Sequence, residues 1–349
     1  MIKIGIICPS EIAYRRFLPS LQQAEGFQYL GVAIASPPEW FGENFSTVGQ
    51  ETIEKVVTAE RNKALKFVDT YGGKIFEGYE TLILSDEIDA IYLPLPPALH
   101  FKWAVKALQN NKHVFVEKPS TTCLADTQRL VSLAKEKNLA LHEDYMFVYH
   151  NQLDAINEIV RSGELGDIRL YRITFGFPRR DSHDFRYNKA LGGGALLDAG
   201  GYTMKYATTL LGMSGKLVAA TANYLPDFEV DMFGSATMVN DDGVVAQLAF
   251  GMDNDYKCDI EIWCSKGTLT SSRVLTAPTG FVPTCTIKKN QEYETRNLPS
   301  DDAFLKSILR FESCVKDDTI RQENYQMIEH QESLVEKFKE LSNMCQMRQ

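Results

Sequence analysis

Short apolar runs alternate with helical segments over the first 145 residues, and this alternation limits the possible folds more than any other feature. Ile2–Ile7 is β-branched and continuous, which is typical of a strand buried on both faces of a parallel sheet. Four similar runs follow, at Tyr29–Ser36, Asp89–Leu95, Lys112–Val116 and Ala140–Glu143. Segments with helical spacing lie between them, at Glu11–Ala24, His100–Gln109 and Cys123–Glu136. Strands alternating with helices predict right-handed crossovers and a doubly wound parallel sheet of the Rossmann type.

The pattern changes after Arg169 to longer strands of alternating polarity. Six such strands are predicted, at 169–176, 217–224, 235–239, 244–251, 258–263 and 268–273. They predict a C-terminal α/β domain built on a large, mainly antiparallel sheet that is open on one face. Two helices near 303–315 and 324–342 close the chain, and Ser300-Asp301 is the expected cap of the first. The stretch 39–58 has no clear period and is interpreted as a loop or a partly helical insertion.

A chain of 349 residues exceeds the size at which one core usually keeps growing, so two domains are expected. We place the Rossmann domain at residues 1–120 and the second domain at 121–349. Residues 121–145 are a segment that can complete the first sheet.

Composition excludes some partners. The net charge of -9 repels polyanions, and the cations are scattered, so nucleic-acid binding has no electrostatic basis. The apolar N-terminus is too short for a signal peptide, and no later run is long enough to span a membrane. Seven widely spaced cysteines, without a C-x-x-C pair, are expected to be reduced thiols, which favours a cytoplasmic location.

The first strand-to-helix turn is the predicted site for a dinucleotide pyrophosphate, which backbone amides and the helix dipole would hold. Compared with the pattern G-x-G-x-x-G/A, this turn keeps only the last position, Ala13, while Cys8 and Ser10 replace both glycines. Glu11 and Ile12 begin the helix whose amides face the turn. This segment alone is equally compatible with a turn that binds no ligand.

The second strand ends without the acidic residue that often binds a ribose 2′-hydroxyl; Ala35-Ser36-Pro37 stands there instead. We therefore favour NADP over NAD, with Ser36 and Pro37 beside the ribose. Candidate counter-charges for the 2′-phosphate are Arg15, Arg16 and Arg61.

Glu117-Lys118-Pro119 places a charged pair at the carboxyl end of a buried strand, the edge where open α/β sheets bind ligands. A partly desolvated lysine can donate a hydrogen bond to a carbonyl oxygen and stabilise the alkoxide that forms during hydride addition. The alternative is a solvated ion pair that only ends the strand.

A second set of candidates follows the glycines Gly192-Gly193-Gly194. If the next residues are helical, Asp198 and Tyr202 lie four apart on one face and can converge on one ligand. Tyr202 is then a candidate proton donor, with Asp198 as its orienting or substrate-binding partner. Without the lysine, Tyr202 would be interpreted as a core aromatic.

Three motifs in this order resemble the glucose-fructose oxidoreductase / inositol dehydrogenase (Gfo/Idh/MocA) family, over nearly the whole chain. They are Pro94-Leu95-Pro96-Pro97-Ala98-Leu99-His100, Glu117-Lys118-Pro119, and Gly-Gly-Gly-Ala-Leu-Leu-Asp-x-Gly at 192–200. Many members carry histidine where this chain has Tyr202. The tyrosine, together with 12–16 and 143–147, is more similar to the branch of NDP-sugar 3-ketoreductases and dihydrodiol dehydrogenases.

The resemblance implies a nicotinamide near Lys118, with Lys118 and Tyr202 as the proton-handling pair. It implies substrate contacts at Tyr149, Arg186 and Asp198, and it adds Leu95, His100 and Glu117 to the cofactor site. His100 is equally compatible with a helix N-terminal cap. The resemblance also implies that the C-terminal sheet forms homodimers or homotetramers.

We therefore expect an NAD(P)-dependent oxidoreductase acting on a ring carbon of a sugar or nucleotide-sugar. No metal is expected, because no paired His/Cys spacing exists and Lys118 supplies the positive charge. Two alternatives stay open: a non-catalytic dinucleotide- or sugar-binding regulator on the same fold, and an enzyme that recycles a tightly held NAD.

Overall fold

The computed structural model describes residues 1–346, and side chains as far as residue 343. Residues 347–349 of the predicted second domain and the thiol of Cys345 lie outside the described part. The chain divides into two compact units. The first comprises residues 1–121, 125–144 and 307–326, and the second comprises residues 122–124, 145–306 and 327–349.

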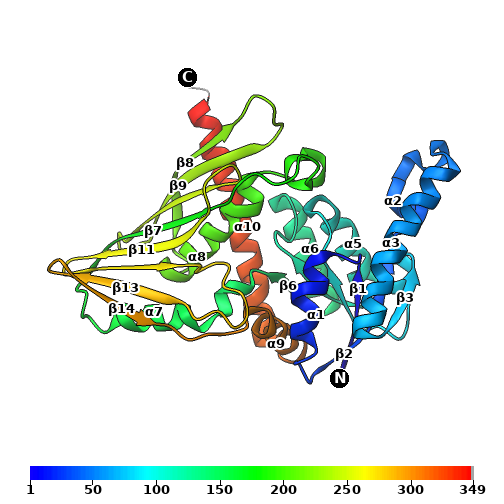
Figure 1. Ribbon diagram of the computed structural model, residues 1–349, viewed down its shortest axis with the longest axis horizontal. Helices are drawn as coiled ribbons and strands as arrows, with labels where there is room; N and C mark the ends of the chain where they lie inside the picture. Colours follow the sequence, from blue (N-terminus) through cyan, green and yellow to red (C-terminus); the bar gives the residue numbers. More distant parts are fainter. Residues whose placement is uncertain (347–349) are drawn as a thin grey trace. The chain divides into compact units, whose positions relative to one another are not determined.

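The first unit contains a six-stranded parallel sheet in the order β3-β2-β1-β4-β5-β6 (Figure 1). Its strands are β1 (Ile2–Ile7), β2 (Phe27–Ile34), β3 (Lys74–Glu77), β4 (Ala90–Leu93), β5 (His113–Glu117) and β6 (Leu141–Asp144). Strand β4 and the apolar residues Ile4, Ile6 and Ile7 of β1 are inaccessible to solvent, as expected for central strands with continuous apolar runs. The predicted Rossmann-type sheet is confirmed, and β6 is its sixth strand.

The helices of this unit are mostly those expected, with one large addition. They are α1 (Leu18–Leu21) with the π-helical η1 (Ala13–Phe17) before it, α2 (Pro37–Phe41), α3 (Gln50–Tyr71), α4 (Tyr79–Ile83), α5 (Pro97–Gln109) and α6 (Leu124–Lys137). Most of α9 (Ala303–Lys316) and the start of α10 (Asp318–Gln346) also belong to this unit. The insertion predicted as a loop or partly helical flap is helical: α2 leads through the 3₁₀ turn η2 (Gly42–Thr47) into the 22-residue α3. Strand β3 and helix α4 were not predicted.

The second unit contains an eight-stranded sheet in the order β14-β13-β12-β11-β7-β10-β9-β8. The strands are β7 (Ile168–Gly176), β8 (Lys216–Tyr224), β9 (Asp231–Val239), β10 (Val245–Gly251), β11 (Lys257–Cys264), β12 (Thr268–Ser272), β13 (Thr284–Lys289) and β14 (Glu292–Asn297). All neighbours are antiparallel except β7 and β10, which are parallel. The predicted mainly antiparallel sheet is therefore confirmed.

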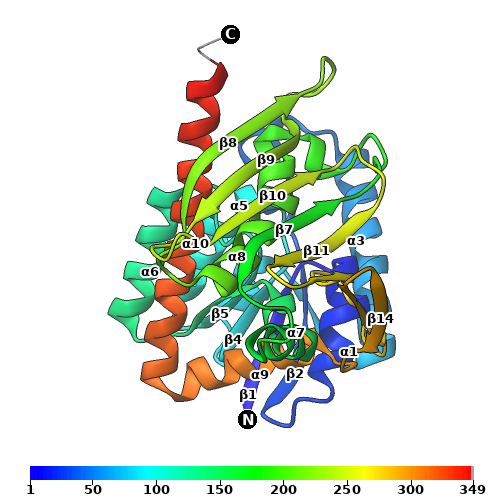
Figure 2. The ribbon, with the colours of Figure 1, turned by 90° about the vertical axis from the view of Figure 1, so that its left-hand side faces the viewer.

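One face of the large sheet is covered and the other is open. Residues alternate between buried and exposed along β9, β10 and β12. The buried set packs with helix α8 (Gly201–Leu211) and with Phe338 of α10 (Asp318–Gln346), whose ring lies 5.5 Å from that of Phe250. Figure 2 shows β8, β9, β10, β7 and β11 side by side, with α8 behind them.

Several details of the second unit differ from the prediction. Helix α7 (Asn151–Arg161) and strands β13 and β14 were not predicted. The cap of α9 (Ala303–Lys316) is Asp302, which accepts the amide of Leu305 at 3.0 Å. The predicted cap residue Asp301 instead accepts the amide of Asn151 and pairs with Lys306. These contacts tie the start of α9 to that of α7.

Candidate functional site

The carboxyl edge of the parallel sheet collects the residues predicted to bind the cofactor. Strands β1 and β4 are neighbours at the centre of the sheet, and the chain continues outward from them in opposite directions. This reversal of strand order is the point at which doubly wound sheets bind dinucleotides. Cys8 follows β1, Ser36 follows β2, Leu95 follows β4, and Lys118 follows β5.

The β1 turn keeps the backbone shape of a glycine-rich turn without its glycines. Cys8 has φ 78°, in the left-handed region that favours glycine. The Ser10 hydroxyl accepts the amide of Ala13 at 3.2 Å, and Ala13 is fully buried, as close helix packing requires. The amides of Glu11 and Ile12 belong to the first helical turn, where no intrahelical acceptor exists. This turn therefore fits a pyrophosphate.

The thiol of Cys8 makes a contact that sequence reasoning missed. It forms a side-chain hydrogen bond with Tyr79, at the start of α4. Burial and the nearby charge of Glu60 raise the pKa of Cys8 to about 12, although part of the residue reaches the surface. Burial also raises the pKa of Tyr79. The contact links the turn after β1 to the start of α4.

The carboxylate of Glu39 accepts backbone amides of the turn after β2 and of the start of α4. Ser36 and Glu39 form a capping box at the start of α2, in which Pro37 is the first residue. Glu39 Oε2 accepts the amides of Ser36 at 2.7 Å and Tyr79 at 2.9 Å, and Oε1 accepts that of Glu80 at 2.9 Å. Three backbone donors thus converge on one side chain.

Two of the three arginines predicted as counter-charges for the 2′-phosphate already lie beside carboxylates. Arg61 donates to Glu77 at 2.7 Å, and Arg15 lies 3.6 Å from Glu11. Arg16 is partly exposed. The two carboxylates therefore offset the charge of two of the three predicted cations.

His100 is a buried link between two loops of the edge. It is completely buried in the first turns of α5, with Nδ1 at 2.8 Å from the Pro119 carbonyl oxygen and Nε2 at 2.7 Å from that of Leu95. Burial lowers its pKa to about 4. The cap alternative is wrong, because Pro96 is the N-cap of α5 and no side chain caps the helix. In this structure the ring nitrogens contact the chain itself.

Lys118 directly follows Glu117, whose side chain is held by a hydrogen bond from Tyr92. The phenol of Tyr92, buried in β4, donates to Glu117 Oε1 at 2.6 Å, and the Tyr92 ring stacks on Phe17 at 3.8 Å. Glu117 pairs in register with Asp144 on β6. Burial, followed by the charge of Glu117, raises the pKa of Asp144 well above its usual value. Lys118 therefore follows a carboxylate whose position is fixed by β4 and β5.

The second unit holds an ion-pair cluster built from the predicted substrate residues. Arg186 donates from Nε to Asp198 Oδ2 at 2.6 Å and from a terminal nitrogen to Asp184 Oδ1 at 3.1 Å. The side chains are 13–21% exposed, so the cluster is largely removed from water. Two carboxylates surround one guanidinium, and the cluster carries a net negative charge.

The glycines position this cluster by allowing close backbone approach. A Cβ at Gly193 would lie 2.4 Å from the carbonyl oxygen of Arg186, so no larger residue fits there. Gly194 has φ 122° and donates its amide to the same carbonyl at 2.9 Å. Asp198 then lies in a π-helical turn, η6 (Leu196–Gly200), a distortion that is frequent at functional sites.

Tyr202 follows in the first turn of α8, on the same helical run as Asp198. Its residue is 8% exposed, and its ring packs against Tyr145, Phe147 and Phe175 with centroids 5.2–5.5 Å away. Tyr149 ends the short 3₁₀ turn η3 (Met146–Tyr149) and is partly exposed. The aromatic cluster fixes the ring of Tyr202.

Two further features bear on function. Within residues 1–346, no helix is both long and apolar enough to cross a membrane. Six cysteines with described side chains are free thiols.

Comparison with known families matches both halves of the chain. Residues 26–145 match the model described as an oxidoreductase family with an NAD-binding Rossmann fold, and residues 153–270 match the GFO/IDH/MocA C-terminal domain.

Two similar relatives are named dTDP-3,4-didehydro-2,6-dideoxy-alpha-D-glucose 3-reductase. The one from Actinomadura kijaniata is 36% identical over 90% of this chain and 87% of its own, and the one from Saccharopolyspora spinosa is 32% identical over 91% and 89%. The crystal structure of KijD10, a 3-ketoreductase from A. kijaniata in complex with NADP and TDP-benzene, has a TM-score of 0.86 at 33% identity and covers 97% of both chains. The chain belongs to the GFO/IDH/MocA oxidoreductase family and is an NAD(P)-dependent oxidoreductase.

Proposed function

We propose that the protein is an NADPH-dependent ketoreductase that acts on a ring carbon of a nucleotide-linked sugar, of the dTDP-keto-sugar class. The observation that carries the proposal is the anchored Glu117 beside Lys118 at the carboxyl edge of the parallel sheet. The names and bound molecules of the similar 3-reductases support the same class of substrate.

In this proposal a bound nicotinamide supplies the hydride, and the chain supplies positioning and proton transfer. Lys118 donates a hydrogen bond to the carbonyl oxygen and stabilises the negative charge that grows on it. Tyr202 delivers the proton, and its ring has little freedom because three aromatic side chains surround it.

Asp198 is the proposed acceptor for sugar hydroxyl groups, and Arg186 holds it in place. The cluster with Asp184 has one more negative than positive charge, so it favours neutral hydroxyl donors over a diphosphate. Tyr149 is proposed as a further substrate contact. The proposed cofactor contacts are Cys8, Ser10, Glu11, Ile12, Ala13, Ser36, Pro37, Leu95 and Glu117. His100 is proposed to hold two of the loops that carry these contacts.

The test replaces Lys118 by Met and Tyr202 by Phe. With a dTDP-3,4-didehydro-2,6-dideoxy sugar, K118M is expected to lower kcat by about 10²–10³, the range for losing one electrostatic donor. Y202F is expected to lower it by about 10²–10⁴, as for a lost general acid. NADPH binding and the thermal unfolding temperature should change little. The control is Lys102→Met, on the neighbouring helix α5. Wild-type turnover in K118M would show that Lys118 takes no part in the mechanism.

The rival function is a non-catalytic dinucleotide-binding regulator, which the turn Cys8-Pro9-Ser10 favours because it lacks both glycines. Nicotinamide fluorescence separates the two. Binding of NADPH without its oxidation across a panel of keto-sugars would support the regulator. An enzyme that recycles a tightly held NAD would instead retain the dinucleotide through purification.

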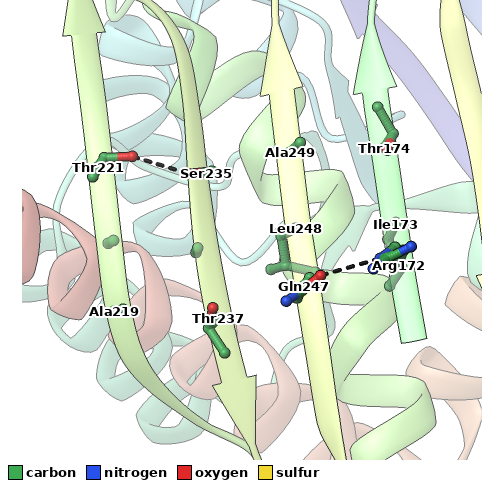
Figure 3. Close-up of a pocket in the computed structure, with 12 residues that line it drawn as sticks. Arg172, Ile173, Thr174, Ala219, Thr221, Ser235, Thr237, Gln247, Leu248 and Ala249 are labelled. Atoms are coloured by element: carbon green, nitrogen blue, oxygen red, sulfur yellow. Dashed lines mark hydrogen bonds between the residues drawn. The ribbon is translucent and has the colours of Figure 1, made fainter. Parts of the chain in front are cut away.

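We also propose that the protein is a cytoplasmic homo-oligomer that assembles through the open face of the large sheet. A shallow depression of about 410 Å³ lies on this face (Figure 3). Small and polar side chains line it, with a Thr221–Ser235 hydrogen bond of 2.9 Å at one side and an Arg172–Gln247 bond of 3.1 Å at the other. Such a flat surface suits a second copy of the same sheet.

A further inference from the structure

We infer that Glu39 is a specificity-determining residue of the nucleotide site: it occupies the backbone donors of the turn after β2 and places a carboxylate there, so this chain discriminates only weakly between NADPH and NADH. The inference rests on the proposed function, because it assumes that the dinucleotide ribose lies at the end of β2. It deepens that proposal by naming the residue that limits the preference for the phosphorylated cofactor.

The turn after β2 offers few hydrogen-bond donors to a ligand. A 2′-phosphate needs several donors, and the amides of the turn after β2 are the nearest ones the fold provides. The Ser36 amide is bonded to Glu39 Oε2 at 2.7 Å, and Pro37 and Pro38 have no amide hydrogen. The Trp40 amide is bonded to the Ser36 carbonyl at 3.0 Å. The Ser36 hydroxyl is the main donor that this turn retains for a ligand.

Carboxylates gather at the corner of the sheet where β2 and β3 end. Glu77 ends β3 and is in register with Ile34, the last residue of β2. Glu39 reaches the same corner, because its carboxylate accepts the amides of Tyr79 and Glu80 just beyond β3. The cations near this corner are already paired, Arg61 with Glu77 at 2.7 Å and Lys106 with Glu80. Glu39 adds a further carboxylate, which disfavours a phosphate that carries almost two negative charges.

The carboxylate is not an ordinary ribose ligand either. Glu39 Oε2 accepts two backbone amides and Oε1 accepts one, so three of about four acceptor sites of the carboxylate are directed at the chain. The carboxylate therefore opposes the 2′-phosphate, while it has room for only a single bond to the 2′-hydroxyl that selects NAD. The binding free energies of NADPH and NADH are therefore expected to differ little, and this difference is what sets the discrimination between them.

The experiment measures the dissociation constants of NADPH and NADH by quenching of protein fluorescence, for the full-length wild-type protein and for two variants. Glu39→Gln removes the charge and keeps the size of the side chain, while its amide nitrogen cannot accept the backbone amide that the replaced oxygen accepts. Glu77→Gln, at a side chain that is 53% exposed, leaves Arg61 without its carboxylate partner. Each variant is expected to increase the preference for NADPH over NADH by about fivefold, the effect of one charge interaction at a partly exposed site. The increase should shrink as the salt concentration rises.

Glu43→Gln is the matched control, since it removes the same charge from the exposed 3₁₀ turn η2. The inference is overturned if the preference stays unchanged in both variants, if E43Q changes it equally, or if E39Q weakens both cofactors by the same factor. If E39Q fails to fold, E77Q alone decides. A wild-type protein that binds neither dinucleotide would instead contradict the proposed function, so the two failures are distinguishable.

Discussion

At the scale of single residues, Cys8 shows how a chain keeps a functional turn after losing the residue that usually makes it. The backbone at this position is left-handed, at φ 78°, which costs an L-residue roughly 1–2 kcal/mol. Burial of the thiol and its hydrogen bond to Tyr79 offset this cost. The turn therefore depends on a partner 71 positions away, a dependence that a glycine would not have.

Comparison of Cys8→Gly with Cys8→Ala isolates the backbone cost. Both variants lose the thiol contact, but only alanine keeps a Cβ in the left-handed conformation. We expect C8G to exceed C8A in free energy of unfolding by about 1 kcal/mol, measured by chemical denaturation. At ordinary helical or extended positions the order is the reverse, so an alanine variant that is the more stable of the two would contradict the strained-turn interpretation.

At the scale of secondary structure, prediction succeeded where a segment's own pattern is strong. The buried strands β1, β4 and β5 and the alternating strands β7 to β12 were recognisable from their apolar residues. Strand β14 was missed because nearly all of it is exposed, and β3 because its four residues begin and end with charged side chains.

The candidate site follows the same division. Lys118 was predicted from its place after a strand. Glu39 was missed although Ser36-Pro37-Pro38-Glu39 has the spacing of a capping box, and its contact with Tyr79 joins residues 40 positions apart. Such contacts leave no periodic signal in the sequence. Asp198 and Tyr202 were placed on one helical run, but the π-turn that holds Asp198 was not foreseen.

The junction of β5 with the segment before β6 yields a prediction about pH. His113 Nδ1 accepts the amide of Ala140 at 2.9 Å, and burial, followed by the charge of Arg321, lowers the His113 pKa to about 4. In the unfolded chain this histidine has a pKa near 6.5, so the unfolded state binds more protons between pH 6.5 and 4. Its contribution to stability is therefore complete above pH 6.5 and is lost as the pH falls toward 4.

His113→Asn keeps an acceptor near the Nδ1 position but cannot be protonated. Between pH 7 and pH 4 the wild-type protein is expected to lose about 2 kcal/mol more unfolding free energy than H113N, as measured by urea denaturation at each pH. The exposed His183→Asn serves as the control, and it should follow the wild type. Equal acid sensitivity in H113N and wild type would show that this histidine is not the group responsible.

At the scale of the whole molecule, the second unit keeps most of its hydrophobic residues on one face of the large sheet. The other face carries small and polar residues together with the partly exposed rings of Phe233 and Trp263. Thr221 and Ser235 bond to each other across β8 and β9, and Ala249 lies two strands from β8 on β10. The short side chains of β8, β9 and β10 permit close approach of another sheet, with little loss of side-chain entropy. The arrangement of these strands suits a two-fold interface in which each copy presents the same strands to the other.

Charge placed in the depression on this surface, at Ser235, should prevent assembly. We expect sedimentation velocity to give the wild-type protein a mass at least twice the 39.4 kDa of the chain, and Ser235→Arg to give the monomer. The reason is that two-fold symmetry would bring the new arginines close together in a desolvated interface. Thr58→Arg adds the same charge on the exposed side of α3 and should leave the assembly intact. A wild-type protein that stays monomeric at all concentrations, or an S235R variant that assembles normally, would show that the open face of the sheet is not the interface.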